Sequence, residues 1–345
     1  MHERLFGRSG PQLALVEIVA HFNNIGIAEM EKSYYGKALQ SFHKALSKAG
    51  GSAAAELWNP LLCGYSPKSG DFTSAKNSYL YQRGSYDEGM HVYTQPIRIE
   101  HKLANPLTFQ DVLIRVLYNK GLAHLELAED ERASEAFFHA LSLCRWRSDV
   151  KAMSTIAILH NIGYIQYRAS CHEEAMHTFE EALQLGRQVY GSHSLEVAAT
   201  MNCLGALYFH MPNPATEEAL DLYQQCLVIR KAILGVQHKD VATTLNNIGR
   251  VNYIKAEYEE ALSNYSEALS IRRVVLGESH LDVAATIYNA GQTYHQIGDL
   301  TRAMQLYQDF ITIALPQLGN KHRDIAIIYK CMAQIFQEKL SLIHI

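Results

Sequence analysis

Residues 245–269 read LNNIGRVNYIKAEYEEALSNYSEAL, and this stretch decides the fold. Leu245 and Ile248 begin an apolar face that follows the 3.6-residue period of a helix. After a polar turn, Ala261 and Tyr265 begin a second apolar face with the same period. The stretch therefore predicts two helices joined by a short turn, with small residues where the helices approach each other.

The same pattern returns along the chain at a nearly constant interval. A small residue marks the first helix of each pair, and an Ala and then an aromatic residue follow in the second helix. The interval is 42 residues except for one of 44, where Pro212 and its neighbours lengthen the turn. The marking residues are Gly121, Gly163, Gly205, Gly249, Gly291 and Ala333. Such a period indicates stacked helix pairs that bury their apolar faces only against their neighbours.

The junction between two pairs carries a more specific pattern. Residues 268–284 read ALSIRRVVLGESHLDVA, and this run resembles the tetratricopeptide repeat in the longer form of kinesin light chains. The resemblance covers about residues 115–345 and, through Gly26 and Phe42, about residues 14–48. It implies an all-α fold, an α-α superhelix or solenoid whose concave face binds extended peptides or partner helices.

We expect three parts along the chain: residues 1–48 with a first repeat, an irregular insert at 49–110, and a tandem array at 111–345. Gly26 and Gly121 are separated by one repeat and roughly 53 further residues, which form the insert. The β-branched and aromatic residues of 78–100 favour a β-hairpin. The alternative is a degenerate repeat with Tyr93 in the aromatic position. The last unit has only its first helix, which predicts a capping partner, self-association or fraying.

An Asn lies two residues before the marking residue in most units. The set is Asn24, Asn119, Asn161, Asn247 and Asn289. Asn is a mediocre helix former, so its return at one helical position needs a reason. In the resembled family this position faces the groove, where an amide can donate to and accept from the backbone of an extended peptide. The alternative is a ladder of Asn side chains that links one repeat to the next, and both can hold.

Further groove candidates follow from helical spacing around the same position. They are His160, Asn202, Asn246, Tyr288, Arg250, Tyr253, Tyr167, His295 and Lys330, beside Tyr164, Phe209 and Gln292. This aromatic and weakly basic lining suits an acidic peptide with an apolar anchor residue. Core packing or solvation is the alternative for each of these side chains taken singly.

Composition excludes several classes of protein. The 345 residues are 48% hydrophobic with a net charge of -4, which opposes disorder and nucleic-acid binding through phosphates. We find no signal peptide, membrane helix or nucleotide-binding loop, so we expect a reduced cytoplasmic protein, or alternatively a nuclear one. His238, His280 and His322 recur once per unit, too far apart to share a metal, and we assign them to hydrogen bonding where a helix starts.

We therefore predict a scaffold or adaptor that binds protein segments, without catalysis, metal or cofactor. One alternative is a structural subunit of a larger complex, for example a cargo adaptor like kinesin light chain. Further alternatives are a helical-repeat RNA binder, opposed by the acidic net charge, and a regulatory arm of an enzyme. The oligomeric state is left open.

Overall fold

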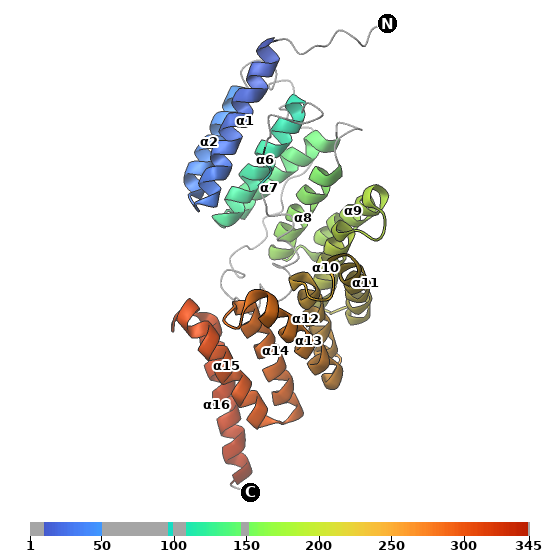
Figure 1. The fold of residues 1–345 in the computed structure, drawn as a ribbon, viewed down its shortest axis with the longest axis vertical. Coiled ribbons are helices and arrows are strands. Elements are labelled where there is room, and N and C mark those ends of the chain that lie inside the picture. Colours follow the sequence, from blue (N-terminus) through green and yellow to red (C-terminus); the bar gives the residue numbers. More distant parts are fainter. Residues whose placement is uncertain (1–9, 50–95, 99–107, 146–151, 344–345) are drawn as a thin grey trace. The chain divides into compact units, whose positions relative to one another are not determined.

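The computed structural model describes residues 10–49, 96–98, 108–145 and 152–343 (Figure 1). All thirteen regular elements in these residues are α-helices, so the all-α prediction is confirmed for this part of the chain. Contacts between Cα atoms divide the chain into two compact units, with the boundary of the described helical arrays after Leu185. None of the described helices is long and apolar enough to cross a membrane.

The helices of the first unit between residues 10 and 168 contact their neighbours in chain order. Its helices are α1 (Gly10–Glu31), α2 (Tyr35–Ala49), α6 (Phe109–Glu126), α7 (Asp130–Arg145), α8 (Ala152–Arg168) and α9 (His172–Tyr190), which continues past the boundary. α2 contacts α6 directly, although the insert separates them in the sequence. The first helix pair therefore stacks on the second as consecutive repeats do.

The second unit repeats the arrangement. Its helices are α10 (Leu195–His210), α11 (Thr216–Leu234), α12 (Lys239–Ile254), α13 (Tyr258–Leu276), α14 (Leu281–Ile297), α15 (Leu300–Leu318) and α16 (Arg323–Ile343). Each helix contacts the next, and α12 also contacts both α10 and α14. We call the first helix of each pair an A helix (α1, α6, α8, α10, α12, α14 and α16) and the second a B helix.

The marking glycines lie where an A helix meets the aromatic ring of its B helix. A Cβ atom added at Gly249 would lie 2.6 Å from Cε1 of Tyr265, closer than carbon atoms approach. At Gly121 the nearest ring atom, of Phe137, would lie at 2.7 Å. The predicted close approach of the two helices is therefore confirmed, and both rings are buried.

The starts of three A helices carry the predicted histidine contact. The Nδ1 atoms of His238 and His280 accept from the backbone N–H two residues later at 3.1 Å, and that of His322 does so at 3.3 Å. Each histidine thereby satisfies one of the free N–H groups of a helix N-terminus. The prediction of a hydrogen bond at the helix start is confirmed.

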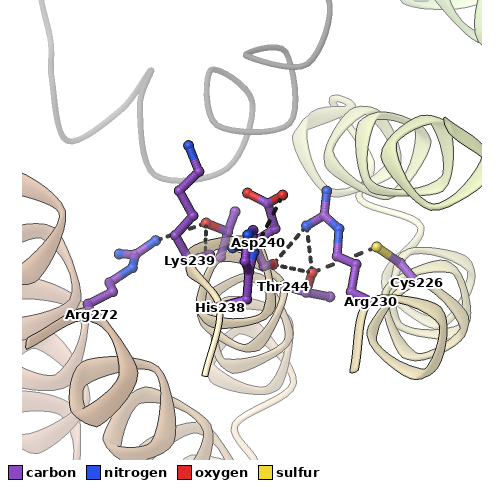
Figure 2. Close-up of polar contacts among 8 residues, drawn as sticks. Cys226, Arg230, His238, Lys239, Asp240, Thr244 and Arg272 are labelled. Atoms are coloured by element: carbon purple, nitrogen blue, oxygen red, sulfur yellow. Dashed lines mark hydrogen bonds and ion pairs between the residues drawn. The ribbon is translucent and has the colours of Figure 1, made fainter. Parts of the chain in front are cut away.

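Buried arginines connect each of two B helices to the next A helix. Nη1 of Arg230 on α11 donates to the backbone carbonyl of Asp240 and to Oγ1 of Thr244, both at 2.8 Å (Figure 2). Arg272 on α13 makes the same pair of bonds one repeat later, to Asp282 and Thr286. These contacts fix how consecutive repeats pack in this unit.

The insert and the last helix bear on two other predictions. Residues 96–98 have no regular secondary structure, and the rest of the hairpin expected at 78–100 lies outside the described residues. The division into three parts accordingly stays a prediction. On α16, Tyr329, Phe336 and Leu340 are more than half exposed. Capping, self-association or fraying of the last unit also stays a prediction.

Candidate functional site

Side-chain amides join neighbouring A helices in a ladder. In each rung, the Asn two residues before a marking Gly donates to the residue three before the marking Gly of the preceding repeat. In the three rungs, Nδ2 donates to Oδ1 of the partner side chain: Asn119 to Asn23 at 2.9 Å, Asn247 to Asn202 at 3.2 Å, and Asn289 to Asn246 at 3.0 Å. These side chains are buried, except for Asn289, which is half-buried. The ladder alternative raised by the sequence is thus present in the structure.

Asn161 forms a rung of a different kind. The position that holds Asn in the other rungs holds Tyr118, and the Tyr118 side chain is hydrogen-bonded to Asn161. Burial raises the pKa of Tyr118, and the bond to Asn161 lowers it by less, so the phenol stays protonated. Nδ2 of Asn161 also donates to the carbonyl of Ala157 in its own helix at 2.9 Å.

Asn119 also holds the backbone of Ile97. Its Oδ1 accepts from the N–H of Ile97 at 2.8 Å, and its Nδ2 donates to the carbonyl of the same residue at 3.0 Å. Nδ2 of Asn23 is 3.4 Å from that carbonyl. Because the N–H and C=O of one residue point to the same amide, the backbone of Ile97 is extended there. This is the paired donor and acceptor contact that an amide can make with a peptide.

The next residue is held from both A helices of the first two repeats. Nη1 of Arg115 on α6 donates to the carbonyl of Arg98 at 2.8 Å. The guanidinium of Arg98 pairs with the carboxylate of Glu31 at the end of α1, and both side chains are more than half exposed. We call this surface, formed by Asn23, Glu31, Arg115 and Asn119, the α1/α6 site.

Asn247 occupies the position of Asn119 in the second unit. Its Nδ2 binds Asn202, whereas its Oδ1 is buried and has no hydrogen-bond partner among the described residues. An unsatisfied buried acceptor costs about 1–3 kcal/mol, so it calls for an explanation. In Asn119 the same atom accepts from a backbone N–H.

A pocket of about 260 Å³ opens between α12, α14 and α16. Its lining includes Tyr253, Gln292, His295, Gln296, Cys331 and Glu338. Nε2 of His295 lies 3.2 Å from both carboxylate oxygens of Glu338. Burial raises the pKa of Tyr253 and of Cys331, so both are neutral near pH 7. The pocket therefore offers amides, a phenol and a histidine beside a carboxylate to a side chain that forms hydrogen bonds.

Three further candidates lie in the first unit. Asn24 is half-buried, and its Oδ1 is 3.4 Å from Nδ2 of Asn23. His160 is completely buried, and its ring packs edge-on to Phe179 with 5.6 Å between ring centroids. Burial lowers the pKa of His160 to about 3, so the ring is neutral. Tyr167 is half-buried with its ring 6.0 Å from that of His172.

The remaining candidates lie in the second unit. The guanidinium carbon of Arg250 stacks 4.5 Å from the centre of the Phe209 ring. Tyr288 accepts a hydrogen bond from Nε2 of Gln292 at 2.7 Å, and its ring packs against Tyr307. Lys330 is exposed. The structure thus places Tyr253, Gln292 and His295 around one pocket of the second unit.

Sequence reasoning missed five contact residues. Asn23 and Tyr118 lie three residues before Gly26 and Gly121, so extending the position of Asn202 and Asn246 to every unit would have found them. Glu31, Arg115 and Glu338 carry no such signal. Glu31 and Arg115 meet a segment of the insert, and the repeat pattern does not predict where the insert lies.

The histidine, cysteine and acidic side chains of the described residues bear on metal binding and on thiol chemistry. No cluster of His, Cys, Asp or Glu among them could hold a metal ion. Burial raises the thiol pKa of Cys144 to about 11 and that of Cys203 to about 12. These thiols are protonated near pH 7, whereas nucleophilic catalysis needs a thiolate. The arrangement offers hydrogen bonds to a ligand.

Comparisons with solved structures agree with this architecture. BtubC (BKLC) from P. vanneervenii is 20% identical with a TM-score of 0.53 over 70% of this chain and 94% of that one. A structure of TPR-like repeats that are nearly identical to one another, assigned to a kinesin light chain of Podosopora anserina, is 16% identical to this chain. Its TM-score is 0.51 over 59% of this chain and 95% of that one. NprR in complex with its cognate peptide NprX is 18% identical, with a TM-score of 0.50 over 66% of this chain and 63% of that one.

The sequence itself identifies the repeats. No curated protein sequence matches the chain significantly. Residues 154–216, 215–269 and 240–315 each match the family model of the tetratricopeptide repeat. These matches coincide with the helix pairs, the marking glycines and the regular period. Residues 154–315 of the chain therefore consist of tetratricopeptide repeats, and repeats assigned to a kinesin light chain are among the solved structures with a similar fold.

Proposed function

We propose that the chain is a non-catalytic scaffold that binds extended segments of partner proteins along the face of its A helices. The observation that supports this most is the pair of hydrogen bonds by which the amide of Asn119 binds the N–H and the carbonyl of Ile97, an extended residue. We call this contact the asparagine clasp, and Ile97 the clasped residue. Such contacts do not depend on the ligand side chain, so they suit many sequences. NprR, a similar fold, is known in complex with a peptide.

In the second unit, Asn247 and the pocket between α12, α14 and α16 are the proposed contacts. The Oδ1 of Asn247, which is buried in the unbound chain, accepts a backbone N–H of the partner once the side chains that cover it move aside. The pocket receives one side chain of the partner. Arg250 and Lys330 on the same A helices favour an acidic segment, whereas Glu338 favours a neutral or basic side chain inside the pocket. Acidity of the partner and a cytoplasmic location both stay predictions.

The test compares two variants that break the same rung of the ladder. Partners are captured from native lysate, and synthetic peptides that tile the captured proteins are titrated by fluorescence anisotropy. Asn247→Ala removes the rung and the free acceptor, whereas Asn202→Ala removes the rung but keeps Oδ1 of Asn247. Circular dichroism confirms that both variants fold.

We expect Asn247→Ala to weaken peptide binding by about tenfold, which corresponds to roughly 1.4 kcal/mol. Asn202→Ala should weaken it much less. If both variants lose the same affinity, Asn247 acts through the ladder alone. If no tiled peptide binds the wild-type chain, the proposal of peptide binding fails.

A further inference from the structure

We propose that the α1/α6 site binds extended segments in which a basic residue follows the clasped residue, and that residues 96–98 of this chain are its resident ligand, displaceable by a competing segment. This inference rests on the proposed function, because it takes the asparagine clasp to be a peptide-binding contact. It adds the chemistry of the ligand and the identity of the competitor.

The contacts that hold the segment are mostly to its main chain. The backbone of Ile97 meets Asn119 through its N–H and its carbonyl, and the same carbonyl meets Asn23. The carbonyl of Arg98 accepts from Arg115. These groups belong to every non-proline residue, so the site would hold another extended segment in the same way.

The choice of side chain comes from Glu31. Its carboxylate pairs with Arg98, and it is the last residue of α1, where the partial negative charge of the helix end also favours a cation. Because both side chains are exposed, the pair contributes more to selecting the ligand than to affinity. The site therefore selects a basic residue directly after the clasped one.

The segment lies on the surface of the repeats. Ile97 is half-buried and Arg98 is exposed, so neither residue is part of the apolar core. The first two repeats stack through the direct contacts of α2 and α1 with α6. Packing of the repeats therefore does not depend on the segment, and its release leaves the site formed.

A ligand in the same chain is a strong competitor. Its effective concentration can reach the order of mM, so a free peptide binds this site weakly until the resident segment is released. Partners that recognise the site must then outcompete residues 96–98. The first repeats are accordingly a regulated site, open only to ligands that bind better than the chain's own segment.

The test weakens the resident segment within the full chain. The double variant combines two changes. Ile97→Pro removes the N–H that donates to Oδ1 of Asn119, and Arg98→Glu replaces the ion pair with Glu31 by repulsion between two carboxylates. Arg98→Glu alone is a milder second variant. The probe is a fluorescent synthetic peptide with the sequence of residues 93–101, titrated by anisotropy. Lys44→Glu, an equal change of charge at an exposed position of α2, is the matched control.

We expect the double variant to bind the probe at least tenfold more tightly than the wild type, with Arg98→Glu alone intermediate and Lys44→Glu unchanged. Adding Asn119→Ala to the double variant should abolish this gain. A probe with Arg98→Glu should bind better to a chain with Glu31→Arg than to one with Glu31. Equal affinity for wild type and double variant, or a gain that survives Asn119→Ala, overturns the inference.

The outcome also separates this inference from the proposed function. If the probe does not bind the double variant while partner peptides still distinguish Asn247→Ala from Asn202→Ala, only the α1/α6 inference fails. If neither the probe nor any partner peptide binds, the proposed peptide binding fails as well. Circular dichroism of each variant confirms that loss of binding is not loss of fold.

Discussion

At the scale of single residues, the close spacing between A and B helices depends on glycines, which have no Cβ. Each marking Gly lies so close to an aromatic ring that an added Cβ would overlap it. At Gly163, the added Cβ would lie 2.7 Å from the ring of Phe179. Glycine lowers helix stability by about 1 kcal/mol relative to Ala, so the close packing must offset that loss. In each repeat, glycine therefore lowers the stability of the A helix itself but allows close packing against the B helix.

Gly249→Ala should destabilise the chain by about 1–2 kcal/mol. The added Cβ would lie 2.6 Å from the buried ring of Tyr265, and overpacking costs about 1–3 kcal/mol, which exceeds the gain in helix propensity. Urea unfolding followed by circular dichroism measures the change. Gly36→Ala on α2 is the matched control, because nothing lies within 4 Å of its Cβ, and it should be neutral or stabilising.

His160 should make stability depend on pH. Burial lowers its pKa in the folded chain to about 3, against an ordinary value of 6.5. Between these values the unfolded chain takes up a proton that the folded chain does not, so stability falls as the pH falls from about 6.5 towards 3. For this residue alone the loss between pH 7 and pH 5 is about 2 kcal/mol.

Urea unfolding at both pH values, with His160→Asn for comparison, isolates this contribution. Asn occupies the same position in the repeats of Asn202 and Asn246 and does not titrate. The lowered pKa values of His124 and His139 affect both proteins alike. An equal loss of stability in wild type and variant would contradict the assignment of a neutral, buried His160.

At the scale of helices, the junction from a B helix to the next A helix is held by buried cations. Arg272 is 1% exposed, and its Nη1 binds a backbone carbonyl and a threonine hydroxyl of α14. Its neighbour Arg273 points outward and pairs with exposed Glu278 at 2.9 Å. Two adjacent arginines therefore differ only in which side of α13 they occupy.

Arg272→Met should lower the free energy of unfolding by about 2 kcal/mol, because it leaves buried acceptors without their donor. Arg273→Met should change it by less than about 0.5 kcal/mol, since an exposed ion pair contributes little. Urea unfolding of the two variants gives the comparison. Similar losses in both would show that the buried hydrogen bonds do not stabilise the junction.

At the scale of the whole molecule, the contacts between helices within each unit join mainly neighbours in the chain. Stability of such an array is close to a sum of repeat and interface contributions, so damage to one repeat stays local. The described helices form two compact units, which strengthens the expectation that damage to one repeat stays within its unit. Unfolding is accordingly not expected to be a single all-or-none transition.

Hydrogen exchange of Arg272→Met tests this locality. Amides of α13 and α14, the helices joined by Arg272, should lose protection first, and those of α12 and α15 should follow. Amides of α1 and α2 should exchange as in the wild type. An even loss of protection across all described helices would show that the chain unfolds as one cooperative unit.

The sequence determined what depends on local spacing. The 42-residue period, the helix pairs, the approach of Gly249 to Tyr265 and the histidine at the helix start all follow from residues close together in the chain. The asparagine position was also visible, because it repeats at one point of each A helix. Apolar periodicity and small residues act within one or two repeats, so a single sequence carries them.

Only the tertiary structure decided which residues meet across repeats. The ladder joins positions offset by one residue, Asn247 with Asn202, and the period alone does not say which positions of neighbouring A helices face each other. His160 is buried although its spacing suggested the groove, since neighbouring helices cover it. The position of Ile97 on Asn119 depends on the path of the insert, and no repeat pattern encodes that path.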